Sequence, residues 1–108
     1  MSTKQPAIVE TYLRASNAHD TAAMLLCFAK DAVVHDEGRK YHGVAAISGW
    51  VETTTRRYQP TIAVTDTSAQ AGEAVVTGRA SGNFDGSPAE LHYHFILADD
   101  HITALTIR

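Results

Sequence analysis

The sequence predicts an α+β domain in which helices cover one face of a curved antiparallel sheet. Apolar residues recur at helical spacing in the first half of the chain and alternate at strand spacing in the second half. Turn-forming residues separate the later segments by short connections, which favour antiparallel neighbours. Helices gathered before strands are the pattern of an α+β layer structure.

The chain is expected to form one domain over residues 1–108. A chain of this size buries roughly 65% of the surface that it exposes when unfolded, so a core can form without a metal or a disulfide. The composition of 44% apolar and 19% charged residues is typical of a globular protein.

Three helices are predicted. Pro6 suits the first turn of a helix over about residues 5–17, because its missing N–H would have no partner there. Asp20 is a good N-cap for a short, largely buried helix over residues 21–28, since its carboxylate accepts from free amides. A third, amphipathic helix is expected from residue 44 to about residue 57, ahead of the next proline.

A short hairpin and four longer strands complete the predicted sheet. In the hairpin, the β-branched run 32–36 returns as residues 39–41 after the turn signal Glu37-Gly38. The longer strands are expected at residues 61–68, 73–84, 90–98 and 102–107.

The strand over residues 90–98 is apolar on both faces. One face carries Leu91, Tyr93, Phe95 and Leu97, and the other carries His92, His94, Ile96 and Ala98. A sheet of this kind needs two covering layers. The helices are one layer, and we expect a second copy of the chain to be the other, giving a homodimer through the outer sheet face.

Charge and cysteine content narrow the partners and the compartment. The net charge of −3 and the lack of a basic stripe argue against nucleic acid, and the pairs Arg39-Lys40 and Arg56-Arg57 are interpreted as solvated surface. The single Cys27 cannot form an internal disulfide, which favours the cytoplasm. No apolar run approaches the ~20 residues of a membrane span, and no signal segment follows residues 1–5, so no membrane partner is expected.

Four segments have a characteristic order and spacing along nearly the whole chain. They are residues 8–13, residues 28–36, residues 43–47 with Trp50, and residues 94–102. In this respect the chain resembles the nuclear transport factor 2-like superfamily. That superfamily has a cone-shaped α+β fold and includes ketosteroid isomerases, SnoaL-like polyketide cyclases, limonene epoxide hydrolases and scytalone dehydratases.

Among these relatives, ketosteroid isomerase is the nearest mechanistic match. Its catalytic base follows a Phe-Ala-x-Asp-Ala segment, where Asp36 stands here, and its oxyanion tyrosine matches Tyr12, 24 positions earlier. The third residue of that family, a protonated carboxylic acid, falls on His94. The resemblance implies that Asp36 is a base and that Tyr12 and His94 donate to an enolate oxygen, without a metal or cofactor.

The orientation of His94 is a point of conflict. Strand alternation alone would place the more apolar face, with Tyr93, against the helices and His94 outward. The family pattern places His94 inward, and we follow it because the turn before Ile102 sets the register. A one-residue bulge would reverse this assignment.

An apolar wall between helices and sheet would contact the substrate if the cone is hollow. The expected substrate-binding residues are Phe28, Val34, Trp50, His92, Ile96 and Leu105. Such a lining suits a hydrophobic carbonyl compound such as a steroid, polyketide or terpenoid. The sequence therefore predicts a small-molecule-binding, cofactor-independent acid/base enzyme of the isomerase, cyclase or dehydratase type.

Two other functions fit the same residues. In a non-catalytic ligand-binding or assembly module, Tyr12 would fill the core and Asp36 would bond turn amides. In a metal-dependent enzyme, His35, His92 and His94 would be ligands, but no cysteine pair or acidic cluster completes a shell.

Overall fold

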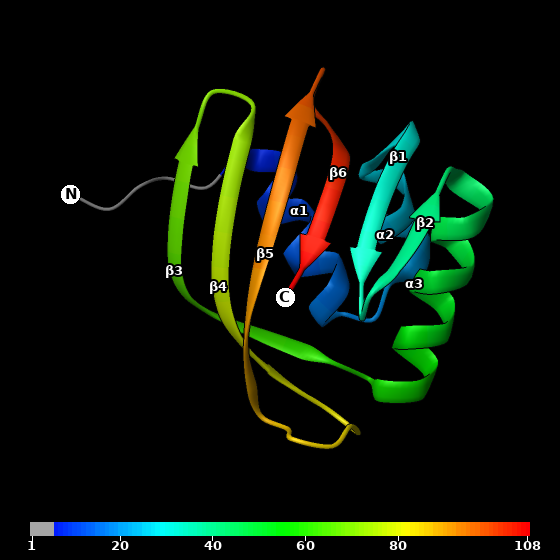
Figure 1. Cartoon of the computed structure of the whole chain (residues 1–108), viewed down its shortest axis with the longest axis vertical. Helices are drawn as coiled ribbons and strands as arrows, with labels where there is room; N and C mark the ends of the chain where they lie inside the picture. The colour runs from blue at the N-terminus through cyan, green and yellow to red at the C-terminus, as the bar shows by residue number, and fades with distance from the viewer. Residues whose placement is uncertain (1–5) are drawn as a thin grey trace.

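The computed structural model describes residues 6–108 as three helices and a six-stranded sheet (Figure 1). The elements are α1 (Ala7–Asn17), α2 (Thr21–Leu26), β1 (Phe28–Asp36), β2 (Arg39–His42), α3 (Val44–Tyr58), β3 (Thr61–Gln70), β4 (Glu73–Ser81), β5 (Ala89–Ala98) and β6 (His101–Ile107). The predicted α+β class is confirmed. The start of the first predicted helix, at Gln5, lies outside the described residues.

The strands lie in the order β2-β1-β6-β5-β4-β3. Four of the neighbouring pairs are antiparallel, whereas β1 and β6 run in the same direction (Figure 1). The prediction of an antiparallel sheet is wrong for this one pair. Short connections make consecutive strands antiparallel, but β1 and β6 are not consecutive. The other four strands lie between them in the sequence, so no short connection sets their relative direction.

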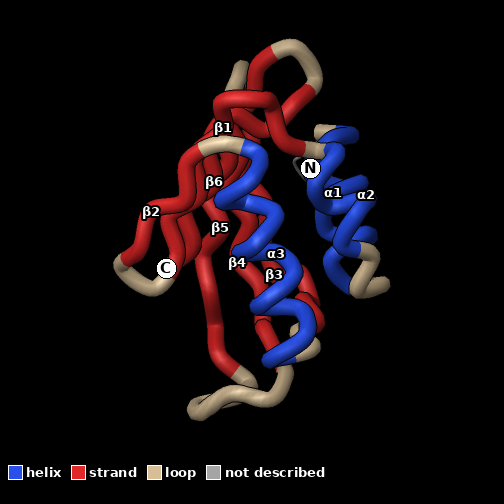
Figure 2. The backbone as a smooth tube through the Cα atoms, turned by 90° about the vertical axis from the view of Figure 1, so that its right-hand side faces the viewer, coloured by secondary structure: helices blue, strands red, loops and turns tan. Residues whose placement is uncertain are grey.

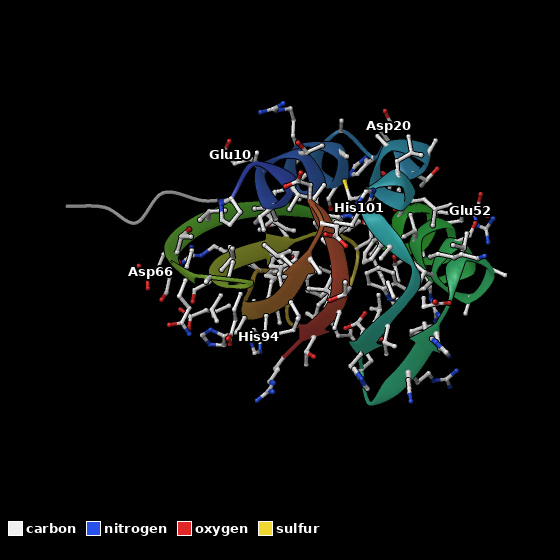
Figure 3. All side chains as sticks on the ribbon, turned by 90° about the horizontal axis from the view of Figure 1, so that it is seen from above. Glu10, Asp20, Glu52, Asp66, His94 and His101 are labelled. Atoms are coloured by element: carbon white, nitrogen blue, oxygen red, sulfur yellow. The ribbon has the colours of Figure 1, made fainter. Side chains whose placement is uncertain are left out.

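The helices lie on the concave side of the sheet (Figures 2 and 3). Val9 of α1, Ile47 of α3 and Phe95 of β5 are completely buried where these layers meet. The Asp20 carboxylate accepts a hydrogen bond from the Ala23 amide at 3.1 Å, as expected of an N-cap. No helix within residues 6–108 is long and apolar enough to cross a membrane.

The second helix is shorter than predicted, because Phe28 begins β1 instead of ending α2. Phe28 pairs with Ile102, and the Ile102 amide donates to the Cys27 carbonyl at 2.8 Å. Pairing with a distant strand therefore ends the helix at a point that local spacing cannot reveal.

A one-residue bulge interrupts β6. Ile96 pairs with Ala104, but the next residue, Leu97, pairs with Ile102, so Thr103 is the extra residue. The Thr103 hydroxyl donates to the Ile96 carbonyl at 3.1 Å. Because a bulge reverses the facing of the residues that follow it, Ile102 and Leu105 are both completely buried.

The strand predicted over residues 73–84 ends at Ser81, and a loop over residues 82–88 follows. The loop approaches the C-terminal end of α3 closely. A Cβ on Gly82 would lie only 2.5 Å from the Tyr58 carbonyl oxygen, and the Asn83 amide donates to that oxygen at 2.8 Å. Glycine is therefore required at residue 82 to hold this loop against α3.

Candidate active site

A cavity of about 770 Å³ lies between the helices and the inner face of the sheet. Its wall draws on α1, on the turn after β1, on α3, on β5 and on the loop over residues 82–88. Among the residues that line it are Tyr12, Asp36, Trp50, Asn83, Phe84 and Tyr93. A volume of this size is within the range of small-molecule sites, and its mixed lining of aromatic and polar groups is typical of them.

Asp36 is the last residue of β1 and supplies a half-buried carboxylate to the cavity. Its Oδ2 accepts a hydrogen bond from the Trp50 indole Nε1 at 3.0 Å, which links β1 to α3. Burial raises the pKa of Asp36, and the Trp50 hydrogen bond offsets part of that rise. The carboxylate is thus positioned by an aromatic donor and is more basic than an ordinary aspartate.

Tyr12 brings a phenol to the same cavity from α1. Its ring meets those of Phe28 and Phe95 edge-on, with centroids 5.6 and 5.7 Å away, and only 2% of the residue is exposed. Burial, followed by the neighbouring Tyr93 and Asp36, raises the pKa of Tyr12. The phenol is therefore neutral, and able to donate, at physiological pH.

Tyr93 of β5 is a second phenol in the cavity. Burial and the charge of Asp36 raise the pKa of Tyr93 to about 12. Within residues 6–108, neither its hydroxyl nor that of Tyr12 has a hydrogen-bond partner, and no fully buried side-chain polar atom is unsatisfied. Both hydroxyls are therefore open to the cavity beside Asp36, where a ligand oxygen can accept from them.

The expectation that His94 faces the cavity is wrong. His94 lies on the opposite face of the sheet from the helices (Figure 3), where its Nε2 is 2.6 Å from Glu73 Oε1. The predicted register assumed regular pairing from the turn before Ile102. The bulge at Thr103 shifts this pairing by one residue, so Tyr93 and not His94 faces inward. The alternation of β5, which placed Tyr93 against the helices, was the correct indication.

The same register corrects two of the expected substrate-binding residues. His92 lies on the outer face, where its Nδ1 is 3.1 Å from the Thr77 hydroxyl oxygen. Ile96 also points outward and is 38% exposed. Neither residue lines the cavity.

Of the remaining expected substrate-binding residues, only Trp50 lines the cavity. Phe28, Val34 and Leu105 are buried in the core between helices and sheet. They lie on the predicted side of the sheet but behind the cavity wall. Sequence patterning identifies an inward position, whereas packing decides whether that position touches solvent or other side chains.

Several residues of the cavity were not among the predicted site residues. Tyr93 and Leu91 could have been found from the apolar alternation of β5. Asn83 and Phe84 were assigned to the end of a strand, but they belong to the loop at the end of α3, where Phe84 packs edge-on against the Tyr58 ring at 6.1 Å. Only the Asp-Gly-Ser-Pro turn that follows marked this loop in advance.

The histidines of the metal alternative do not come together as a site. His92 and His94 contact neighbours on the outer face, and His35 lies two strands away on β1, on the other side of Thr106 of β6. In the part of the chain that the structure describes, no cluster of three or more His, Cys, Asp or Glu side chains could hold a metal ion.

The curved six-stranded sheet with three helices on its concave side defines an NTF2-like α+β cone. The family model described as "SnoaL-like domain" matches residues 9–105. The chain therefore belongs to the SnoaL-like domain family, and the resemblance to the nuclear transport factor 2-like superfamily is confirmed.

Solved structures support the same assignment. The chain is 36% identical to a "putative polyketide cyclase" from Sinorhizobium meliloti, with a TM-score of 0.92 over 96% of this chain and 95% of that one. A protein with a ketosteroid isomerase-like fold from Catenulispora acidiphila, solved with trimethylamine, is 20% identical with a TM-score of 0.84, covering 97% of this chain and 86% of that one. The latter likeness shows the fold alone. No curated protein has a matching sequence.

Proposed function

We propose that this SnoaL-like domain is a cofactor-independent acid/base enzyme that acts on a hydrophobic carbonyl compound, by isomerisation, cyclisation or dehydration. The observation that supports this proposal is that the half-buried Asp36 carboxylate shares a cavity of about 770 Å³ with the hydroxyls of Tyr12 and Tyr93, which have no hydrogen-bond partner within residues 6–108. Asp36 is the base, and Tyr12 and Tyr93 are the hydrogen-bond donors.

In the isomerisation form of the reaction, Asp36 takes a proton from the carbon next to the carbonyl group. The electron pair moves to the carbonyl oxygen, and the resulting enolate oxygen accepts hydrogen bonds from Tyr12 and Tyr93. The protonated Asp36 then returns the proton to another carbon of the conjugated system, so base and donors are regenerated. A raised pKa suits Asp36 to this role, because it makes the carboxylate a better base near neutral pH.

Trp50 is a positioning residue in this scheme. Its N–H donates to Asp36 Oδ2 at 3.0 Å and so fixes the orientation of the carboxylate. The ring is itself part of the cavity wall. Trp50 therefore orients the carboxylate and also gives the cavity an apolar surface that a ligand can contact.

The homodimer and the cytoplasmic location belong to the same proposal. The outer sheet face carries Val75, His94, Ile96 and Ala104 side by side, as the strand register requires, and a second copy of the chain would cover the apolar members of this group. Cys27 is buried and is the only cysteine of the chain, which suits a reducing compartment.

A non-catalytic ligand-binding module is the second candidate. The hydrogen bond from Trp50 favours it, because that bond alone would give Asp36 a structural role in joining β1 to α3. In this case the cavity would still bind an apolar ligand, but no proton transfer would depend on Asp36.

The test is the ultraviolet absorbance change that accompanies conversion of a β,γ-unsaturated ketosteroid to its conjugated isomer. Asp36→Asn keeps the shape of the site and removes the base, so turnover should be lost. His94→Gln is the matched control, since His94 lies on the outer face and its loss should leave turnover unchanged. Equal turnover by the native protein and Asp36→Asn would contradict the proposal, whereas ligand binding without any turnover would favour the binding module.

A further inference from the structure

A second hollow lies outside the main cavity, between α3 and β2, the two elements seen side by side at the right of Figure 1. It is a groove of about 420 Å³, and its lining includes Arg39, Tyr41, Ala45, Ala46, Gly49 and Arg57. Trp50, Thr54 and Tyr58 line both the groove and the main cavity, as do Glu37 and Arg57. The two hollows are therefore adjacent along the same side of α3.

The groove carries two unneutralised positive charges. Arg39 comes from β2 and Arg57 from the last turn of α3, and neither forms an ion pair with a carboxylate in residues 6–108. The Arg57 guanidinium lies 5.5 Å from the centre of the Tyr58 ring, which restricts where it can point. Glu37 is the single acidic residue of the lining, so positive charge is in excess.

The groove also has an apolar part. Ala45, Ala46 and Gly49 are the small residues that α3 presents to it. The Tyr41 and Trp50 rings lie 6.1 Å apart and are tilted by 37° from each other. Small side chains beside aromatic rings admit a planar hydrocarbon segment, and guanidinium groups bind carboxylates with paired hydrogen bonds.

We propose that the groove is a second subsite of the same active site and holds a carboxylate-bearing arm of the substrate. This inference rests on the proposed function, because it places the reacting carbonyl group beside Asp36 and the anionic arm beyond Trp50. The substrate class is then an amphipathic carbonyl compound that bears a carboxylate, rather than a wholly neutral steroid or terpenoid. Arg39 and Arg57, which the sequence alone suggested were ordinary solvated charges, are the specificity residues.

The intrinsic fluorescence of Trp50 provides the readout, since it is the only tryptophan of the chain and lines both hollows. We would titrate the protein with naphthalene-2-acetate and with naphthalene-2-acetamide, which differ mainly in charge. The native protein should bind the acid about tenfold more tightly than the amide. In the double variant Arg39→Gln with Arg57→Gln, the preference for the acid should be lost, so the two affinities should become equal.

Arg56→Gln is the matched control. The substitution removes the same charge from the same turn of α3, but Arg56 lines neither hollow. It should keep the preference for the acid. Gly49→Leu is the second variant. A Cβ at Gly49 meets nothing within 4 Å, so the larger side chain can fill the groove without disturbing the helix, and the preference for the acid should be lost.

Three results would overturn the subsite: no binding of the acid, equal affinities in the native protein, or a preference that survives in the double variant. Failure of the proposed function gives a different result. Turnover of the ketosteroid that does not depend on Asp36 would contradict the acid/base role without changing the binding ratio. An affinity ratio near one with Asp36-dependent turnover would reject only the subsite.

Discussion

At the scale of single residues, the chemistry depends on the pKa of Asp36, on which burial and the Trp50 hydrogen bond are the two largest of four influences. Burial raises this pKa and the Trp50 N–H lowers it, with burial the larger effect. The base works in its ionised form, so kcat/KM should fall as the pH falls through the pKa of Asp36 in the free enzyme. This acid limb should lie at a higher pH than an ordinary aspartate would give.

Trp50→Phe should move that acid limb to still higher pH. The variant keeps an aromatic ring but removes the N–H that stabilises the carboxylate, so the pKa of Asp36 rises further. The measurement is kcat/KM for the ketosteroid across pH, with His94→Gln as the control that leaves the limb in place. An acid limb that stays fixed or moves to lower pH would show that the Trp50 hydrogen bond does not act on the base.

Asp36→Asn should also make the protein more stable at neutral pH. Because the pKa of Asp36 is raised by folding, the folded state favours the protonated carboxyl, and stability is lost as the pH rises through that pKa. The neutral amide avoids this loss. Thermal unfolding should give a Tm a few degrees higher than that of the native protein at pH 7, with the difference disappearing at acidic pH. A lower Tm for Asp36→Asn at pH 7 would contradict the sign of this effect.

Tyr93→Phe tests the assignment of Tyr93, instead of His94, as the second hydrogen-bond donor. The change removes one hydroxyl from the cavity and leaves the ring in place, and loss of one donor of this kind costs about 10²- to 10³-fold in kcat. Tyr12→Phe should have an effect of similar size. If His94→Gln lowered kcat while Tyr93→Phe did not, the assignment of the donors would be wrong.

At the scale of elements, replacing two different glycines by alanine should change the stability of the fold in opposite directions. Gly82→Ala would place a Cβ 2.5 Å from the Tyr58 carbonyl oxygen, so the loop over residues 82–88 must move away from α3. We expect a loss of about 1–3 kcal/mol in the free energy of unfolding. Gly49→Ala, in the middle of α3 with nothing within 4 Å, should instead add about 0.5–1 kcal/mol. Urea denaturation measures both, and a neutral Gly82→Ala would mean that the loop is not held by this contact.

The elements also show which parts of the fold can be inferred from sequence. The Asp20 cap and the alternation of β5 depend on neighbouring residues. The cap was predicted correctly, and the alternation indicated the inward facing of Tyr93, although the prediction followed the family pattern instead. The early end of α2 and the bulge at Thr103 arise from pairing between strands that are distant in sequence. Such pairing leaves no local pattern in the sequence. For this reason the family resemblance was correct, but it assigned the inward position to His94 instead of the adjacent residue that lines the cavity.

At the scale of the whole molecule, the curved sheet separates two kinds of chemistry. The cavity at its inner face holds Asp36 and Tyr93 of the sheet and Tyr12 of α1, whereas its outer face carries His92 and His94 with their partners. Tyr12 and Asp36 were assigned to a pocket from the family resemblance, because spacing alone fits a core position for Tyr12 equally well and a turn role explains Asp36. That they share a cavity with Tyr93 depends on how three layers pack, which no single segment encodes.

The outer face leads to a prediction about assembly that leaves the cavity untouched. Ile96 is exposed at 38% on this face, beside Ala104 of β6, and a second copy of the chain should cover it. Sedimentation equilibrium should give twice the chain mass of 11.7 kDa for the native protein and a single chain mass for Ile96→Glu. A carboxylate buried between two sheets without a partner is costly enough to separate them.

Leu26→Glu is the matched control for this experiment. Leu26 is 79% exposed but belongs to α2, on the helical side of the molecule, so the same charge there should leave the mass unchanged. Turnover per chain should survive Ile96→Glu, because the side chain points away from Asp36 and the cavity. A native protein with the mass of one chain would show that there is no such interface. Dissociation by Leu26→Glu instead of Ile96→Glu would place the interface elsewhere. The first result would leave the cavity chemistry standing as the property of a monomer.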